Sequence, residues 1–181
     1  MHPDPESAWA VWLTGLPASG KSMIAQSLRS LLAARHIHPE ILESDELRKI
    51  LTPQPSYSDD ERDAFYRQMI WIGTLLTRNN VPVIFDATAI RRIWREQARE
   101  QIGKFLEVCV ECPLEVCMAR DPKGIYRRAR EGAAGNVPGL QAAYEPPDNP
   151  DLVVHGDTES PDTAAMRILA KLEERGCLYP S

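Results

Sequence analysis

The chain has 181 residues, of which 43% are hydrophobic and 26% charged, and its formal net charge is −5. This length predicts one domain with enough residues for a hydrophobic core. The acidic balance argues against non-specific nucleic-acid binding, which depends on neutralising phosphates, but it allows a local basic pocket for one small anionic ligand.

The N-terminal residues, Met1 to Glu6, lack the basic segment and the apolar core of a signal peptide. The first apolar run, Ala8 to Leu13, is too short to span a bilayer. We therefore expect a cytoplasmic protein with no membrane partner.

Short apolar runs then alternate with stretches of helical periodicity. Strands are predicted at 9–14, 41–42, 81–85, 105–110 and 152–154, and helices at 21–35, 45–51, 58–79, 93–102, 114–120 and 162–175. Ser58 and Glu61 have the spacing of a capping box at the start of the longest helix. The alternation predicts an α/β fold, a doubly wound parallel five-stranded sheet with helices on both faces.

The segment from about Asp121 to Asn149 interrupts this alternation. It is rich in glycine and proline and carries Lys123 and a cluster of arginines. Long irregular segments in compact domains are usually functional lids or disordered, and the helical pattern of the basic part favours a lid. We predict that residues 1–181 form a single P-loop kinase domain with this segment as its lid.

A pattern with specific chemistry follows the first strand. The residues Gly15, Leu16, Pro17, Ala18, Ser19, Gly20, Lys21 and Ser22 match G-x-x-x-x-G-K-[ST]. The glycines let backbone N–H groups converge on phosphate oxygens, the lysine reaches the β- and γ-phosphates, and the serine hydroxyl binds Mg²⁺. The preceding strand and following helix favour an ATP-binding loop over a surface glycine turn.

Other classes of protein share this loop, among them switch GTPases and motor ATPases. The chain has no N-K-x-D guanine motif and no long regulatory insert. Small-molecule kinases use basic lids to exclude water, which would otherwise accept the phosphoryl group. We therefore predict a kinase that uses ATP and Mg²⁺.

Two aspartates follow predicted strands, at the edge of a parallel sheet where ligands bind. Asp45 comes after Ile41-Leu42, and Asp86 ends the third strand. Phosphoryl transfer to an alcohol needs one group to orient the hydroxyl and accept its proton, and carboxylates to help hold Mg²⁺. Either aspartate could serve either role, although Asp45 also suits a helix N-cap and Asp86 a turn.

Arginine suits phosphate or sulfate oxygens because it binds them in a bidentate manner. Arg48 lies one helical turn after Asp45, and Arg62 and Arg67 lie in the first turns of the long helix. A solvated helix face is the alternative interpretation for each of them.

Four cysteines are present, and Cys109-x-x-Cys112 is compatible with metal or redox chemistry. No second ligand pair follows at zinc-finger spacing, and Cys109 lies in an apolar strand pattern. Buried reduced thiols are the simpler interpretation.

From Gly15 to Val154 the sequence resembles the adenylyl-sulfate kinase family, whose members phosphorylate the ribose 3′-hydroxyl of adenosine 5′-phosphosulfate with MgATP. The passages that carry the resemblance are the loop Leu13 to Ser22, the run Glu107 to Cys117 continuing into Arg120 to Arg130, Tyr144-Glu145-Pro146-Pro147, and Asn149-Pro150.

The resemblance implies roles for individual positions. Asp45 falls on the family's catalytic aspartate. Lys21 of the P-loop and Asp86 after the third strand, which are predicted from the motif and the strand position, complete the catalytic set. Arg120 falls in the family's lid and is expected to contact ATP. The residues expected at the substrate are Asp45, Arg48, Tyr57, Arg62, Lys123 and Val137. Members commonly pair, so a homodimer is a further expectation.

The departures from the family pattern lie on the acceptor side. Phe65 stands where asparagine is usual, and Asp86-Ala87-Thr88-Ala89-Ile90-Arg91 stands where S-F-I-S-P-Y is usual. The family clamps the substrate adenine between two aromatic rings. Tyr57 can supply one, but Val137 occupies the other position, which removes about 1 kcal/mol of stacking.

Three hypotheses follow. The first is an adenylyl-sulfate kinase. The second is a related P-loop kinase with the same ATP site and a different hydroxyl acceptor, such as another nucleotide derivative or a metabolite. The third is a nucleotide-binding partner module without catalysis, against which the complete loop, Asp45 and the lid argue.

Overall fold

The computed structural model describes residues 8–133 and 135–178. Five strands form one parallel sheet in the order β2-β3-β1-β4-β5. The strands are β1 (Ala10–Thr14), β2 (Glu40–Glu43), β3 (Val83–Asp86), β4 (Phe105–Glu111) and β5 (Leu152–His155). The predicted doubly wound five-stranded sheet is therefore confirmed.

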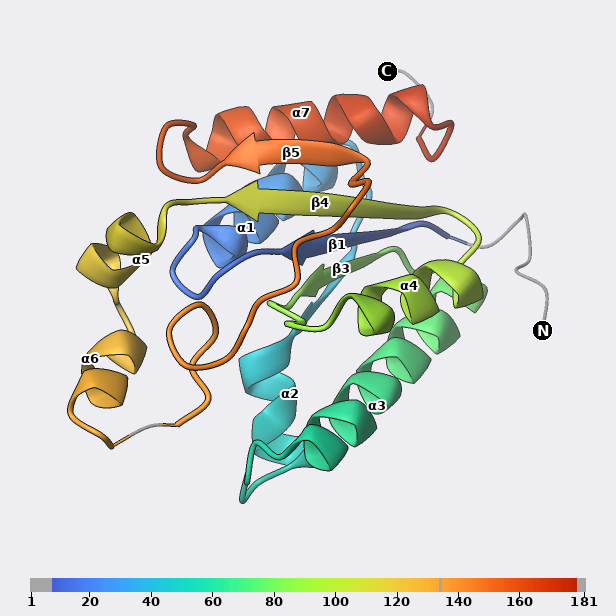
Figure 1. Cartoon of the computed structure of the whole chain (residues 1–181). Helices are drawn as coiled ribbons and strands as arrows, with labels where there is room; N and C mark the ends of the chain where they lie inside the picture. The colour runs from blue at the N-terminus through green and yellow to red at the C-terminus, as the bar shows by residue number, and fades with distance from the viewer. Residues whose placement is uncertain (1–7, 134, 179–181) are drawn as a thin grey trace.

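Helices cover both faces of this sheet (Figure 1). They are α1 (Lys21–Ala33), α2 (Ser44–Leu51), α3 (Asp59–Arg78), α4 (Arg92–Gln101), α5 (Leu114–Arg120), α6 (Ile125–Arg130) and α7 (Pro161–Glu174). Because side chains alternate along β1, Val11 and Leu13 pack in the core under α1 and α7, while Ala10 and Trp12 pack in the core under α3 and α4.

The element boundaries differ from the predicted ones where proline and capping chemistry intervene. β3 begins at Val83 rather than Val81, since Pro82 has no N–H for the ladder. α2 begins at Ser44 and its N-cap position is Glu43, so the interpretation of Asp45 as an N-cap is wrong.

The predicted cap of α3 is half confirmed. The side chain of Ser58 accepts a hydrogen bond from the amide of Glu61. The carboxylate of Glu61 bonds instead to the amides of Ser56 and Tyr57, in a turn where Tyr57 has a positive φ (56°).

Two further expectations concern the cysteines and the membrane. All four cysteines are free, with Cys109 and Cys117 buried, and no cluster of metal-ligating residues lies within the described ranges. None of the helices in those ranges is long and apolar enough to cross a membrane.

Candidate active site

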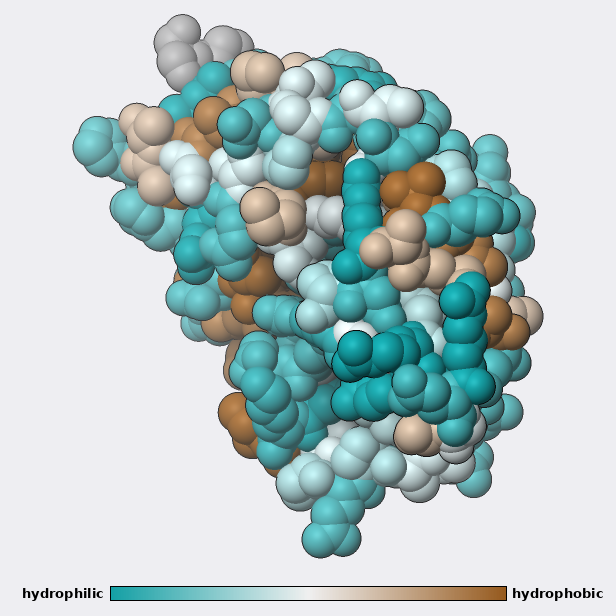
Figure 2. All heavy atoms as spheres, turned by 90° about the vertical axis from the view of Figure 1, so that its left-hand side faces the viewer, coloured by the Kyte–Doolittle hydropathy of each residue, from teal (hydrophilic) through white to brown (hydrophobic). Residues whose placement is uncertain are grey.

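The carboxyl ends of all five parallel strands meet at one edge of the sheet, towards which the arrows in Figure 1 point. Figure 2 looks at this side of the molecule and shows hydrophilic side chains gathered over much of it. Two adjoining hollows lie here, which we call the P-loop pocket and the basic cleft. The two hollows therefore lie at the edge of the sheet where the sequence predicts that ligands bind.

The P-loop pocket has a volume of about 370 Å³ and includes Gly20, Lys21, Ser22, Asp86 and Arg120 in its lining. The loop between β1 and α1 needs its glycines. Gly15 has φ of 153°, and a Cβ there would lie 2.4 Å from the carbonyl oxygen of Val110. Gly20 has φ of 108°.

Lys21 is buried at the floor of this pocket, where its ammonium donates to the carbonyls of Gly15 (2.9 Å) and Leu16 (2.8 Å). Burial lowers the pKa of Lys21, while the nearby charge of Asp86 opposes the change. A buried lysine held by backbone carbonyls can turn its charge to an incoming phosphate.

Asp86 is 4% exposed at the end of β3. Burial raises the pKa of this carboxyl, whereas the charge of Lys21 and a hydrogen bond with Ser22 lower it. The hydroxyl of Ser22 and the carboxylate of Asp86 therefore lie together, and both are oxygen ligands of the kind that Mg²⁺ prefers.

The basic cleft has a volume of about 660 Å³ and adjoins the P-loop pocket. Asp45, Thr88 and Lys123 line both hollows and so form part of the wall between them. The cationic side chains in the lining are Arg48, Lys49, Arg62, Lys123 and Arg128. This excess of positive charge fits an anionic ligand in an otherwise acidic protein.

Asp45 lies in the first turn of α2 and is paired with Lys123, whose ammonium is 2.7 Å from Oδ2 of Asp45 and 3.1 Å from Oε1 of Glu43. Burial alone would lower the pKa of Lys123, but hydrogen bonds with Asp45 and Glu43 and the charges of both raise it above its ordinary value. This ion pair between Lys123 and Asp45 therefore lies in the wall that the two hollows share.

Arg48 is held from two sides. Its guanidinium lies 3.9 Å from the centre of the Phe65 ring and 5.3 Å from that of Tyr57, and Nη1 lies 3.2 Å from Oε1 of Glu61. Phe65 is buried beneath the guanidinium. The aromatic ring that departs from the family pattern thus supports an arginine of the cleft.

Tyr57, Arg62 and Val137 also line the basic cleft. Tyr57 is 42% exposed, whereas Val137 is 4% exposed and packs in a small hydrophobic cluster with Tyr126. Arg62 donates to the carbonyl of Asn136 (2.9 Å), and its Nε is buried without a hydrogen-bond partner among the described residues.

The predicted lid segment contains α6, which is fixed to the P-loop by a hydrogen bond from Tyr126 to the carbonyl of Pro17 (3.0 Å). Arg120, at the end of α5, lines the P-loop pocket and donates to the carbonyl of Gly156 (2.7 Å). The closing motion of the segment stays a prediction.

Most of the predicted residues line one or both hollows. The exceptions are Gly15, Leu16, Ser19 and Arg67, which line neither of them. Sequence reasoning missed Glu43 and Thr88, and it assigned Glu61 to a cap alone. For Glu43 a signal was available, because it directly follows the predicted strand 41–42 and lies two residues before Asp45.

Comparison with known proteins gives one consistent result. The model of the adenylylsulphate kinase family matches residues 7–155. An adenylyl-sulfate kinase of Microcystis aeruginosa is 39% identical over 93% of both chains, and a probable adenylyl-sulfate kinase of Pyrococcus abyssi is 38% identical over 94% of this chain and 98% of its own.

Among solved structures, the APS kinase CysC of Mycobacterium tuberculosis in complex with AMPPNP and APS has a TM-score of 0.87 at 33% identity. The match covers 93% of this chain and 99% of that one. A gluconokinase from Sinorhizobium meliloti, at 18% identity and a TM-score of 0.56, shares the fold.

Proposed function

The chain belongs to the adenylylsulphate kinase family, and from this premise we propose that it transfers the γ-phosphoryl group of ATP to the ribose 3′-hydroxyl of adenosine 5′-phosphosulfate. The observation that carries the proposal is the shared wall of the two hollows. A phosphate-binding loop opens on one side of Asp45 and a basic cleft on the other.

On the donor side, we assign the phosphates of ATP to the P-loop pocket. The loop from Gly15 to Ser22 supplies backbone N–H groups, Lys21 stabilises the charge of the transferring group, and Arg120 covers the nucleotide. Ser22 and Asp86 would hold Mg²⁺, which, when bound, neutralises charge on the β- and γ-phosphates.

On the acceptor side, Asp45 orients the 3′-hydroxyl. As the hydroxyl oxygen bonds to phosphorus, its proton passes to the carboxylate of Asp45, and the bond between phosphorus and the oxygen of ADP breaks. Before this step, Lys123 must move away from Asp45, to which it is bonded at 2.7 Å, and towards the phosphates of ATP, whose negative charge it can neutralise.

Arg48 and Arg62 contact the anionic phosphosulfate, and Tyr57 stacks on the adenine. Val137 offers an apolar surface in place of a second ring. The segment from about Asp121 to Asn149 closes over both nucleotides and excludes water.

One observation favours a second candidate, a kinase with the same ATP chemistry and a different acceptor. Val137, Phe65 and Asp86 all depart from the family pattern, and two of them line the hollows. Such an enzyme would keep the P-loop pocket unchanged while accepting another nucleotide derivative.

A coupled assay of ADP release with MgATP and a panel of acceptors tests the proposal. We expect adenosine 5′-phosphosulfate to be preferred over AMP and other ribose alcohols by orders of magnitude in kcat/KM. A preference for another acceptor would support the second candidate, whereas ATP binding without turnover on any acceptor would support a non-catalytic partner module. The predicted homodimer is a separate question that light scattering in solution answers.

A further inference from the structure

The loop that joins β3 to α4, residues 87–91, is held by several groups that are distant in the sequence. Four of its five backbone carbonyls, at 87, 88, 89 and 90, accept a hydrogen bond from another part of the chain. The donors are Nε1 of Trp12 (3.0 Å), Oγ1 of Thr14 (2.7 Å), the guanidinium of Arg95, and the amide of Glu145 (2.8 Å), in that order. In addition, the amide of Ala89 donates to the hydroxyl of Tyr66 (3.1 Å).

This loop lies where the proposed reaction takes place. Asp86 immediately precedes it and lines the P-loop pocket, Ile90 lines the basic cleft, and Thr88 lines both. Loops of this kind are ordinarily mobile, and a non-glycine residue at positive φ, such as Ala89 (44°), is strained unless its surroundings hold it. The anchors therefore fix a backbone that would otherwise relax.

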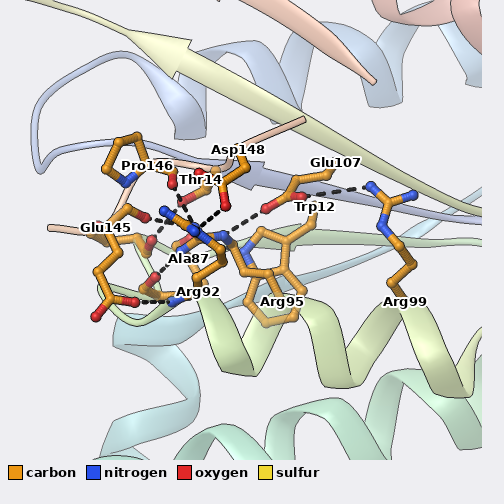
Figure 3. A network of polar contacts seen from close by, with 12 residues as sticks. Trp12, Thr14, Ala87, Arg92, Arg95, Arg99, Glu107, Glu145, Pro146 and Asp148 are labelled. Atoms are coloured by element: carbon orange, nitrogen blue, oxygen red, sulfur yellow. Dashed lines mark hydrogen bonds and ion pairs between the residues drawn. The ribbon is translucent and has the colours of Figure 1, made fainter. Parts of the chain in front are cut away.

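Two anchors also hold the last part of the predicted lid segment, at Tyr144 and Glu145. Nη2 of Arg95 donates to the carbonyl of Glu145 (2.6 Å), while its Nε is paired with Glu107 (2.6 Å). Figure 3 shows Arg95 and Glu107 pointing towards each other, with Thr14, Ala87 and Glu145 nearby.

Thr14 makes the second connection. Its Oγ1 lies 3.0 Å from the hydroxyl of Tyr144. Because the single proton of Thr14 is donated to the carbonyl of Thr88, Tyr144 must be the donor in this pair. A directed chain of hydrogen bonds therefore runs from Tyr144 through Thr14 to the loop, and Thr14 is also the residue that precedes the P-loop.

We propose that Thr14 and Arg95 are positioning residues for phosphoryl transfer. Neither of them lines the P-loop pocket or the basic cleft. They fix the loop 87–90, and with it Asp86 and Thr88, between the two hollows, and they tie this loop to the segment that ends the predicted lid. The inference rests on the proposed function and adds to it the residues that set the distance between donor and acceptor.

The test is Thr14→Val, which keeps the shape of the side chain and removes its hydroxyl. Displacement of the reacting groups by a fraction of an ångström lowers the rate far more than the affinity, so we expect kcat to fall about tenfold or more. The binding of AMPPNP, measured by calorimetry, should change less than about threefold. Thr14→Ser, which restores the hydroxyl, should recover most of kcat.

Thr77→Val is a matched control. Thr77 is equally buried, and its hydroxyl bonds to the carbonyl of Thr74 within α3, away from both hollows. We expect this variant to lose stability and keep its kcat. If both valine variants lower kcat in proportion to their loss of stability, the role of Thr14 is structural and the proposal is wrong.

A second variant tests the proposal independently of Thr14→Val. Tyr144→Phe removes only the hydroxyl that donates to Thr14, at the start of the hydrogen-bond chain. We expect a smaller loss of kcat than in Thr14→Val, again with AMPPNP binding unchanged. Wild-type kcat in both Thr14→Val and Tyr144→Phe would overturn the inference. A wild-type enzyme that turns over no adenosine 5′-phosphosulfate would instead contradict the proposed function, and the two failures are therefore distinguishable.

Discussion

The contact between Lys123 and Asp45 would let one lysine side chain act at two stages of the proposed reaction. In this structure the ammonium neutralises the carboxylate that we assign as the base. An acceptor hydroxyl needs that carboxylate free, and the phosphates of ATP offer the lysine a more highly charged partner. Binding of ATP would therefore release Asp45 for its role.

Asp45→Asn tests this assignment. Asparagine keeps the size of the side chain but cannot accept the proton, so kcat should fall at least about a hundredfold while the KM for ATP changes little. Steady-state kinetics with both substrates varied give the two parameters. Glu174→Gln, on the exposed end of α7, is the control and should behave as wild type. Near-wild-type turnover of Asp45→Asn would remove Asp45 from the role of base.

Glu61 gives a prediction about pH. A hydrogen bond with the Ser56 hydroxyl, together with the amides of Ser56 and Tyr57 and the charge of Arg48, lowers the pKa of Glu61 below 4.5. Its ionised form therefore stabilises the folded state above about pH 4.5, and this contribution is lost as the pH falls from there through the lower pKa of the folded protein.

Glu61→Gln should consequently be less stable than wild type at pH 7, and the difference should shrink as the pH falls below about 4.5. Urea unfolding at pH 7 and pH 3.5 measures it. A difference that stays constant over this range would show that the carboxylate charge contributes nothing. The same variant should raise the KM for the acceptor, because Glu61 also holds Arg48.

Short motifs allowed the candidate residues to be predicted, because their spacing along the chain encodes the chemistry directly. The loop from Gly15 to Ser22 and the aspartates after strands are of this kind. The role of Thr14 could not be predicted in this way, since it bonds to Thr88 across 74 residues and that contact exists only once β1 and β3 pair. For Glu61 the sequence predicted only a role in capping α3, because its other partners, Ser56 and Tyr57, lie in an irregular turn that has no sequence pattern.

At the scale of elements, the first turn of α3 contains both a helix cap and residues that line the basic cleft. Ser58 caps the helix, and the residue before it, Tyr57, faces the basic cleft together with Arg62 from the first helical turn. Fraying of this turn would therefore move two residues that we assign to the acceptor.

Ser58→Ala should cost about 1 kcal/mol of unfolding free energy and should also raise the KM for the acceptor. Ser160→Ala is the matched control, because Ser160 caps α7 in the same way by accepting from the amide of Thr163 (3.1 Å). Urea denaturation and acceptor kinetics on both variants separate the effects. Equal acceptor KM values in the two variants would contradict the link between this cap and the cleft.

The alternation of apolar strands and periodic helices was sufficient to predict the sheet, since each strand of a parallel sheet is buried on both faces. The strand order could not be obtained, because it depends on which crossovers pack together. The boundaries at Val83 and Ser44 differ from the predicted ones for local reasons. Pro82 has no N–H for the ladder, and the N-cap of α2 is Glu43, two residues before the expected Asp45.

At the scale of the whole molecule, one buried ion pair connects the layers. Arg95 of α4 is fully buried and pairs with Glu107 of β4 (2.6 Å), while its other nitrogens bond to two loops. The pair thus joins the helix layer, the sheet and the segments around the hollows.

Glu107→Ala should destabilise the protein by about 3–5 kcal/mol, because it leaves the Arg95 charge buried and unpaired. This is a large fraction of the stability of a typical domain, so the midpoint of thermal unfolding should fall clearly. Glu174→Ala breaks an exposed pair with Lys171 and should cost less than about 1 kcal/mol. Similar losses in the two variants would show that the buried pair has no special role.

The central claim is that the two hollows on either side of Asp45 join ATP to the 3′-hydroxyl of adenosine 5′-phosphosulfate. The most direct measurement is to incubate the protein with MgATP and this acceptor, determine the mass of the product, and locate the new group by phosphorus NMR. The account predicts a product heavier by one phosphoryl group carried on the 3′-oxygen. ADP release without that product, or a phosphoryl group at another position, would contradict it.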